Sequence, residues 1–147
     1  MIGGELFRMY APTREHQDIL EEIFTNIKLH IRQNEGKCKI YAAPFAVYIK
    51  KDNRNYVEPD ISVVCDRDKL DEKDCQGAPD WIIEIVSSSS KTMDYERKVI
   101  LYRETGTREY WIVDPETESV TMYDFEHRTS RETNAETSQQ EPEAVQF

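Results

Sequence analysis

The stretch Asp80-Trp81-Ile82-Ile83-Glu84-Ile85-Val86, followed by serines at 87–90, decides how the rest of the chain is organised. It is short, almost wholly apolar and rich in β-branched residues, which predicts a strand buried on both faces. Side chains alternate along a strand, so Glu84 shares a face with Ile82 and Val86, and its two neighbours take the other. A buried carboxylate is costly unless it is paired, protonated or bound to a metal. Glu84 therefore needs a partner, a proton or a metal ion.

The composition fits one soluble globular domain. The chain has 147 residues, of which 38% are hydrophobic and 33% charged, enough for a real core. No apolar run approaches the length of a membrane span, and residues 1–10 lack the apolar centre of a signal peptide. These features predict a cytoplasmic protein that is not bound to a membrane. The net charge of −10 argues against a protein that binds nucleic acid by charge alone.

The three cysteines, Cys38, Cys65 and Cys75, are widely spaced and contain no CxxC pair. An odd, scattered set suits a reducing cytoplasm better than a disulfide framework or a zinc site.

Hydrophobic periodicity predicts an α+β fold. Thr13 is a candidate N-cap, and apolar residues from Ile19 to Ile31 recur at helical spacing, so a helix of about five turns is expected before Asn34. Gly106 is expected to end a second helix. The other expected elements are strands at 39–42, 45–49, 56–65 and 80–86, the second helix at 92–105, and a hairpin of strands at 109–114 and 119–125. This order predicts a mixed β-sheet with flanking helices.

The chain divides into a folded part and a polar end. Residues 1–125 are expected to form the domain, and 126–147 an acidic tail that is disordered or docked on a partner, because periodicity is lost there. The charged loop at 66–77 has no predicted structure. Lys50, Lys51 and Arg54 lie in a polar turn; such a cluster is commonly a solvated tip, and here it is also a candidate for contact with a phosphate.

A second carboxylate could meet Glu84. Asp60 follows Pro59 at the entrance of a predicted strand, on the same face as Ser62. If the two strands are neighbours, Asp60 and Glu84 converge, and paired carboxylates suit Mg²⁺ or Mn²⁺. Such an ion would polarise a phosphoryl oxygen and activate a water, and Lys98 on the next helix could stabilise the developing charge.

Each of these residues also has a simpler interpretation. Glu84 could pair with a buried cation or stay protonated, and Asp60 could cap the strand entrance. Asp94 and Lys98 could form an exposed i,i+4 ion pair contributing about 0.3–0.5 kcal/mol, and Tyr102, on the same stripe, could be packing. His16 on the first helix could be a surface or packing residue. Asp80 could orient the site or belong to a turn.

Several motifs occur together and in a fixed order. They are Pro59-Asp60, the run from Pro79 to Ser87, Asp94-x3-Lys98-x3-Tyr102, Gly106, and Glu109-Tyr110-Trp111-Ile112-Val113-Asp114-Pro115. With Glu15-His16-Gln17 and Ala43-Pro44, they cover roughly residues 13–125. In this order and spacing the chain resembles the Uma-type family of restriction-endonuclease-like proteins, within the PD-(D/E)xK nuclease superfamily.

The resemblance implies a restriction-endonuclease-like core with a metal at Asp60 and Glu84, and the expected ligand set includes the carbonyl of Ile85. The superfamily lysine, two residues after the acid, is replaced here by Val86. In the Uma-type family that lysine is thought to have migrated to the following helix, which corresponds to Lys98.

The candidate residues and the resemblance are compatible with two functions. The first is a Mg²⁺- or Mn²⁺-dependent endonuclease that hydrolyses DNA, in which neutralising Glu84 would relieve carboxylate repulsion and stabilise the metal-free protein. The second is an inactive binding or assembly module with a nuclease fold, favoured by the acidity and by the missing lysine. Such a module could form a homodimer through aromatic side chains expected at the surface, namely Tyr41, Tyr48, Tyr56 and Tyr123.

Overall fold

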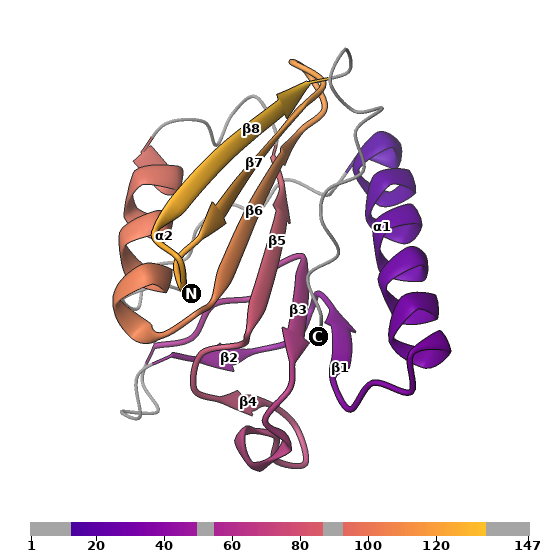
Figure 1. The fold of residues 1–147 in the computed structure, drawn as a ribbon, viewed down its shortest axis with the longest axis vertical. Helices are drawn as coiled ribbons and strands as arrows, with labels where there is room; N and C mark the ends of the chain where they lie inside the picture. The colour runs from indigo at the N-terminus through magenta and orange to yellow at the C-terminus, as the bar shows by residue number, and fades with distance from the viewer. Residues whose placement is uncertain (1–12, 50–54, 87–92, 135–147) are drawn as a thin grey trace.

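A mixed six-stranded sheet lies between two helices in the computed structural model, which describes residues 13–49, 55–86 and 93–134. The strand order is β1-β3-β5-β6-β7-β8 (Figure 1). The helices are α1 (Arg14–Gln33) and α2 (Met93–Thr105). The sheet consists of β1 (Lys39–Ala42), β3 (Ile61–Val64), β5 (Trp81–Ile85), β6 (Glu109–Asp114), β7 (Ser119–Asp124) and β8 (Thr129–Asn134). The predicted α+β class and mixed sheet are confirmed.

The glutamate strand, β5, is a central strand of this sheet. It runs antiparallel to β3 and parallel to β6, and all five of its residues are buried. Its two faces contribute to different cores, as alternation predicts. Trp81 and Ile83 pack beneath α1, whereas Ile82 and Val86 pack against side chains of α2 and β6. Glu84 therefore faces the α2 side of the sheet.

Both helices begin or end where the sequence indicates. The Thr13 side chain accepts a hydrogen bond from the backbone N–H of His16 at 3.1 Å, which caps the first turn of α1. The apolar face of α1, with Phe24 and Ile27 among its contacts, covers the sheet. Helix α2 stops at Gly106, whose φ of 103° lies in the left-handed region that favours glycine.

The middle of the chain is less regular than predicted. The expected strand at 45–49 is reduced to β2 (Val47–Tyr48), which pairs in parallel with β4 (Cys75–Gln76) in a separate small sheet. The loop at 66–77 contains β4 and a short 3₁₀ helix, η1 (Arg67–Lys69). The expected strand at 56–65 begins only at Ile61, because Pro59 has no N–H to donate to a ladder.

The sheet continues beyond the predicted domain boundary at residue 125. Strand β8 pairs with β7 over its full length, so the expected disordered tail is wrong for 129–134, and 135–147 lie outside the described residues. Nearly all β8 side chains are exposed. Because neither face of this edge strand is buried, it has no alternation of apolar and polar residues, and hydrophobic periodicity could not reveal it.

The expectation of cysteines without a disulfide is also wrong. Cys38 and Cys65 form a disulfide. The sequence separates them by 27 residues, but Lys39 pairs with Val64, so the next residues outward face each other across β1 and β3. Cys75 is free and buried, and burial raises the pKa of its thiol to about 11. The cysteines therefore give no support to a reducing compartment.

We expect thiol titration of the denatured protein to report this pairing. Without reductant, a chromogenic thiol reagent should detect one thiol per chain, that of Cys75, and all three cysteines should react after reduction. Three reactive thiols in protein that was never exposed to reductant would contradict the disulfide.

The four tyrosines expected at the surface are half-buried and pack within the chain. Tyr41 stacks on Phe45, Tyr48 packs against Tyr56, and Tyr123 stacks on Tyr110. These contacts remove the aromatic argument for a homodimer. Within the described ranges, no helix is long and apolar enough to cross a membrane.

Candidate active site

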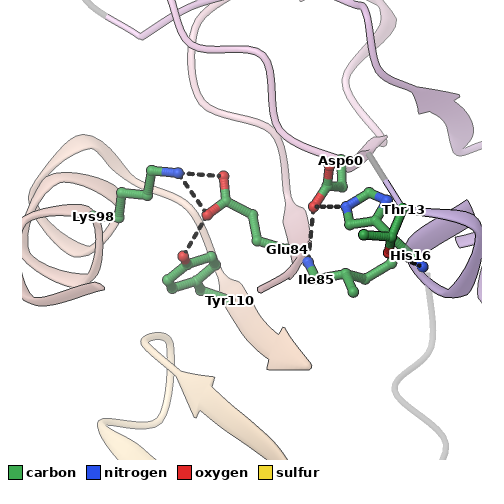
Figure 2. Close-up of polar contacts among 7 residues, drawn as sticks. All are labelled: Thr13, His16, Asp60, Glu84, Ile85, Lys98 and Tyr110. Atoms are coloured by element: carbon green, nitrogen blue, oxygen red, sulfur yellow. Dashed lines mark hydrogen bonds and ion pairs between the residues drawn. The ribbon is translucent and has the colours of Figure 1, made fainter. Parts of the chain in front are cut away.

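Glu84 on β5 and Asp60, the residue just before β3, lie at one end of the sheet. The β3–β5 register pairs Ile61 with Ile83, so one step further places Asp60 opposite Glu84. Figure 2 shows the two side chains between α2 and the first turn of α1. Directly opposite residues have Cβ atoms roughly 4.5–5.5 Å apart, within reach of a shared ligand. The predicted convergence of these carboxylates therefore agrees with the strand register.

Glu84 is buried and makes three polar contacts with other described residues. Only 7% of the residue is exposed. Lys98 Nζ donates to both carboxylate oxygens, at 3.1 Å to Oε1 and 2.9 Å to Oε2. The Tyr110 hydroxyl donates to Oε2 at 2.8 Å. The cost of burying this charge is thus offset by one cation and one neutral donor.

Lys98 belongs to the site and not to an exposed face of α2. Its side chain is 29% exposed and points toward the sheet, where Glu84 is its partner (Figure 2). Tyr102, one turn further along the same stripe, is fully buried. The Asp94 side chain, and with it the expected i,i+4 pair, lies outside the described residues. The i,i+4 spacing alone had favoured a surface pair, since it contains no information about a partner on another element.

Asp60 is held from two sides. Its Oδ2 accepts a hydrogen bond from the backbone N–H of Ile85 at 2.8 Å and lies 3.3 Å from His16 Nε2. Its own carbonyl accepts from the N–H of Ala43, which continues the β1–β3 ladder by one step. The Asp60 side chain is 23% exposed, so it borders both the core and solvent. The strand-cap interpretation accounts for the Ile85 bond but not for the histidine.

Tyr110 is a site residue that sequence reasoning did not identify. It lies on β6 opposite Ile82, so alternation places its ring on the face that carries Glu84. Burial, and then the negative charge of Glu84, raise the pKa of both Tyr102 and Tyr110 well above the usual range. Tyr110 therefore remains a neutral hydrogen-bond donor at all physiological pH values. The parallel pairing of β5 with β6 would have been the signal that identifies it.

Replacing Tyr110 with Phe should remove one hydrogen bond and keep the ring packing. We expect the free energy of unfolding to fall by about 1–2 kcal/mol, because a buried charged acceptor loses a donor. Urea denaturation measures this change. Tyr123→Phe is the matched control, since that ring stacks on Tyr110 but its hydroxyl is not bonded to Glu84. Equal losses in the two variants would contradict a specific role of Tyr110.

Asp80 lies away from this cluster, and the cationic turn is outside the described residues. Asp80 lies at the opposite end of β5, where its Oδ2 accepts from the N–H of Cys65 at 2.7 Å and Arg108 lies 3.8 Å from Oδ1. The turn interpretation of Asp80 therefore holds. The cationic turn at 50–54 lies outside the described residues, so its contact with a phosphate stays a prediction.

The donor set suits a small hard cation. The two carboxylates provide oxygen ligands, and the Ile85 N–H points toward Asp60. Since the N–H and C=O of a strand residue face the same neighbour, the Ile85 carbonyl is expected on this side as well. Oxygen ligands of this kind are those that Mg²⁺ prefers. In the described part of the chain, no group of three or more His, Cys, Asp and Glu is placed to hold an ion, so a site here would depend on the carbonyl and water.

The mixed sheet, with helices on both faces, defines an α+β domain of the restriction-endonuclease-like class. The chain belongs to the Uma2 family, described as "Putative restriction endonuclease", whose model matches residues 1–146. Among solved structures, it is similar to a "putative nuclease belonging to DUF820" from Anabaena variabilis ATCC 29413, with a TM-score of 0.72 and 21% sequence identity. That similarity covers 90% of this chain and 74% of the other. A comparison with curated proteins finds no match.

Proposed function

We propose that this protein is a metal-dependent endonuclease that hydrolyses phosphodiester bonds of DNA. The observation that carries the proposal is the convergence of Asp60, Glu84 and Lys98, three charged side chains from three elements, at one end of the sheet. Membership of a family described as restriction endonucleases supports the same chemistry. A buried ion pair such as Lys98–Glu84 contributes little net stability to a fold, which favours a functional reason for its presence.

In this proposal, Asp60, Glu84 and the Ile85 carbonyl hold Mg²⁺ or Mn²⁺. Mg²⁺ or Mn²⁺ held there would supply Lewis-acid chemistry, namely a bound water of lowered pKa and a polarised phosphoryl oxygen. The chain's own residues orient and shield the site. The Ile85 N–H fixes one oxygen of Asp60, and Tyr110 fixes one oxygen of Glu84, at 2.8 Å in each case. Ligands held in this way need little reorganisation when substrate binds.

Lys98 has two roles in the proposed site. Its ammonium balances the buried charge of Glu84, at 2.9 Å from Oε2. It also stands where it can stabilise negative charge that develops on the phosphoryl oxygens during hydrolysis, a role typical of Lys in phosphoryl transfer. Its position on α2 serves the function of the superfamily lysine, because Val86, which occupies the usual position, is apolar and buried.

The net charge of the whole chain is −10, so binding of DNA requires a local cluster of positively charged side chains. Lys50, Lys51 and Arg54 are the proposed phosphate contacts. Binding that depends on so few cations should weaken only modestly with salt, because each phosphate contact adds roughly one unit to the slope of log K against log salt.

The second candidate function is an inactive binding module with this fold. The observation that favours it is the closed ion pair, in which Lys98 contacts both oxygens of Glu84. A lysine that only stabilises the fold would make the same contacts.

DNA cleavage decides between these functions. We expect wild-type protein with Mg²⁺ or Mn²⁺ to cut plasmid, linear or single-stranded DNA, and Asp60→Asn to cut at least about 100-fold more slowly, because an uncharged amide is a poor ligand for a hard cation. The measurement is the rate of substrate loss at matched protein and metal concentrations. Wild-type rates that never exceed the Asp60→Asn background with any of the three DNA forms would leave the binding module as the function.

A further inference from the structure

His16 connects helix α1 to the candidate site. It is in the first turn, where Thr13 accepts its backbone N–H at 3.1 Å, and its side chain is only 17% exposed. The imidazole Nε2 lies 3.3 Å from Asp60 Oδ2, although 44 residues separate the two in sequence (60 − 16). Figure 2 shows the ring pointing from α1 onto that oxygen.

The two ring nitrogens of His16 have different surroundings. Nε2 faces Asp60, and Nδ1 is buried with no hydrogen-bond partner among the residues that the structure describes. A general base needs a nitrogen within hydrogen-bond reach of the proton that it takes, directly or through one water. This orientation favours the contact with Asp60 over direct proton transfer with substrate.

We propose that His16 is a positioning residue that fixes the Asp60 carboxylate for a divalent cation, an inference that rests on the proposed metal-dependent function. Both described side-chain contacts of Asp60 fall on Oδ2, one from the Ile85 N–H and one from His16. Holding Oδ2 from the strand and from the helix stops rotation of the carboxylate. Oδ1 is then the oxygen directed to the cation.

The buried, unpartnered Nδ1 supports a role beyond packing. Leaving a polar atom buried without a hydrogen bond costs about 1–3 kcal/mol, and an apolar side chain at position 16 would avoid this cost. The structure keeps the imidazole, and the contact that the imidazole makes is with Asp60. Residues that orient metal ligands in this way typically change metal affinity by 10- to 100-fold when replaced.

The test is Mn²⁺ binding to metal-free protein, measured by calorimetry, with melting temperature as a separate readout. His16→Gln presents an amide N–H close to the position of Nε2, whereas the shorter His16→Asn side chain does not reach Asp60. Both replacements are polar, so a loss caused by folding alone affects them alike. We expect His16→Asn to weaken Mn²⁺ binding about 10- to 100-fold and His16→Gln to stay within about 3-fold of wild type.

A control variant and the wild-type measurement distinguish a failure of the His16 proposal from a failure of the proposed metal-dependent function. His30→Gln replaces an exposed histidine near the end of the same helix, outside the site, and should bind Mn²⁺ like wild type. Equal Mn²⁺ affinity in wild type, His16→Gln and His16→Asn would overturn the role of His16 while the metal site stands. Equal losses in both His16 variants would also overturn it, because the Nε2 donor would then not matter. Wild-type protein that binds no Mn²⁺ would overturn the metal centre itself.

Discussion

Glu84→Gln is expected to abolish metal-dependent DNA cleavage and to remove the rise in melting temperature that Mn²⁺ gives to wild-type protein. The glutamine has the same shape as the glutamate, but it has lost the charge that a hard cation requires. We expect the cleavage rate to fall at least about 1,000-fold, because the loss affects both ion binding and charge stabilisation. The rate of plasmid nicking and a melting curve with and without Mn²⁺ measure the two effects.

Glu109→Gln is the matched control for this replacement. Glu109 is equally buried, at 7% exposure, and its Oε2 accepts from Trp111 Nε1 at 3.0 Å. It pairs with Trp81, at the opposite end of β5 from the site. We expect this variant to keep both cleavage and the response to Mn²⁺. A Glu84→Gln protein that still cleaves, or that Mn²⁺ still stabilises as much as wild type, would show that Glu84 is not a ligand.

The structure reverses the expected effect of Glu84→Gln on metal-free stability. Repulsion between two carboxylates predicted a gain, but Lys98 contacts both oxygens of Glu84, so the charge is already balanced. The glutamine keeps an acceptor for Tyr110 and loses the ion pair. We therefore expect the metal-free variant to lose about 1–2 kcal/mol of unfolding free energy.

Local sequence patterns predicted the parts of this fold that bury one or both faces of an element. The apolar run at 80–86 identified β5, and the Thr13 cap with its apolar stripe identified α1. Strand β8 was not predicted because it buries neither face, and β4 was not predicted because a two-residue strand has no period. The Cys38–Cys65 disulfide depends on β1–β3 pairing, which no local pattern shows.

The residues of the candidate site also differ in how far the sequence could predict them. Asp60 and Glu84 could be chosen from the sequence because each interrupts an apolar or strand-forming segment with a charge. His16 and Tyr110 could not be ranked, because their roles arise from contacts across 44 and 26 residues with partners on other elements (60 − 16 and 110 − 84). Contacts such as those of His16 and Tyr110 are set by tertiary packing, whereas a candidate ligand such as Glu84 can be recognised from the local cost of burying its charge.

Lys98→Met is expected to slow DNA cleavage but not to weaken Mn²⁺ binding. Methionine keeps much of the length of the side chain but lacks the ammonium that contacts Glu84 at 2.9 and 3.1 Å. Cleavage should fall about 100- to 1,000-fold, since the charge that stabilises the phosphoryl oxygens is gone. Mn²⁺ binding should persist or tighten, because the lysine no longer competes with the ion for Glu84. Cleavage rates and calorimetry with Mn²⁺ test both expectations.

The stability of Lys98→Met separates the nuclease from an inactive module. Without metal, the variant leaves Glu84 buried with Tyr110 as its remaining hydrogen-bond donor among the described residues, and we expect a loss of about 3 kcal/mol in unfolding free energy. In a metalloenzyme, saturating Mn²⁺ replaces the lost positive charge and restores most of that stability. In a structural ion pair, Mn²⁺ has no effect. Arg97→Met, which removes an exposed charge from the adjacent position of α2, is the control and should change stability by less than about 0.5 kcal/mol.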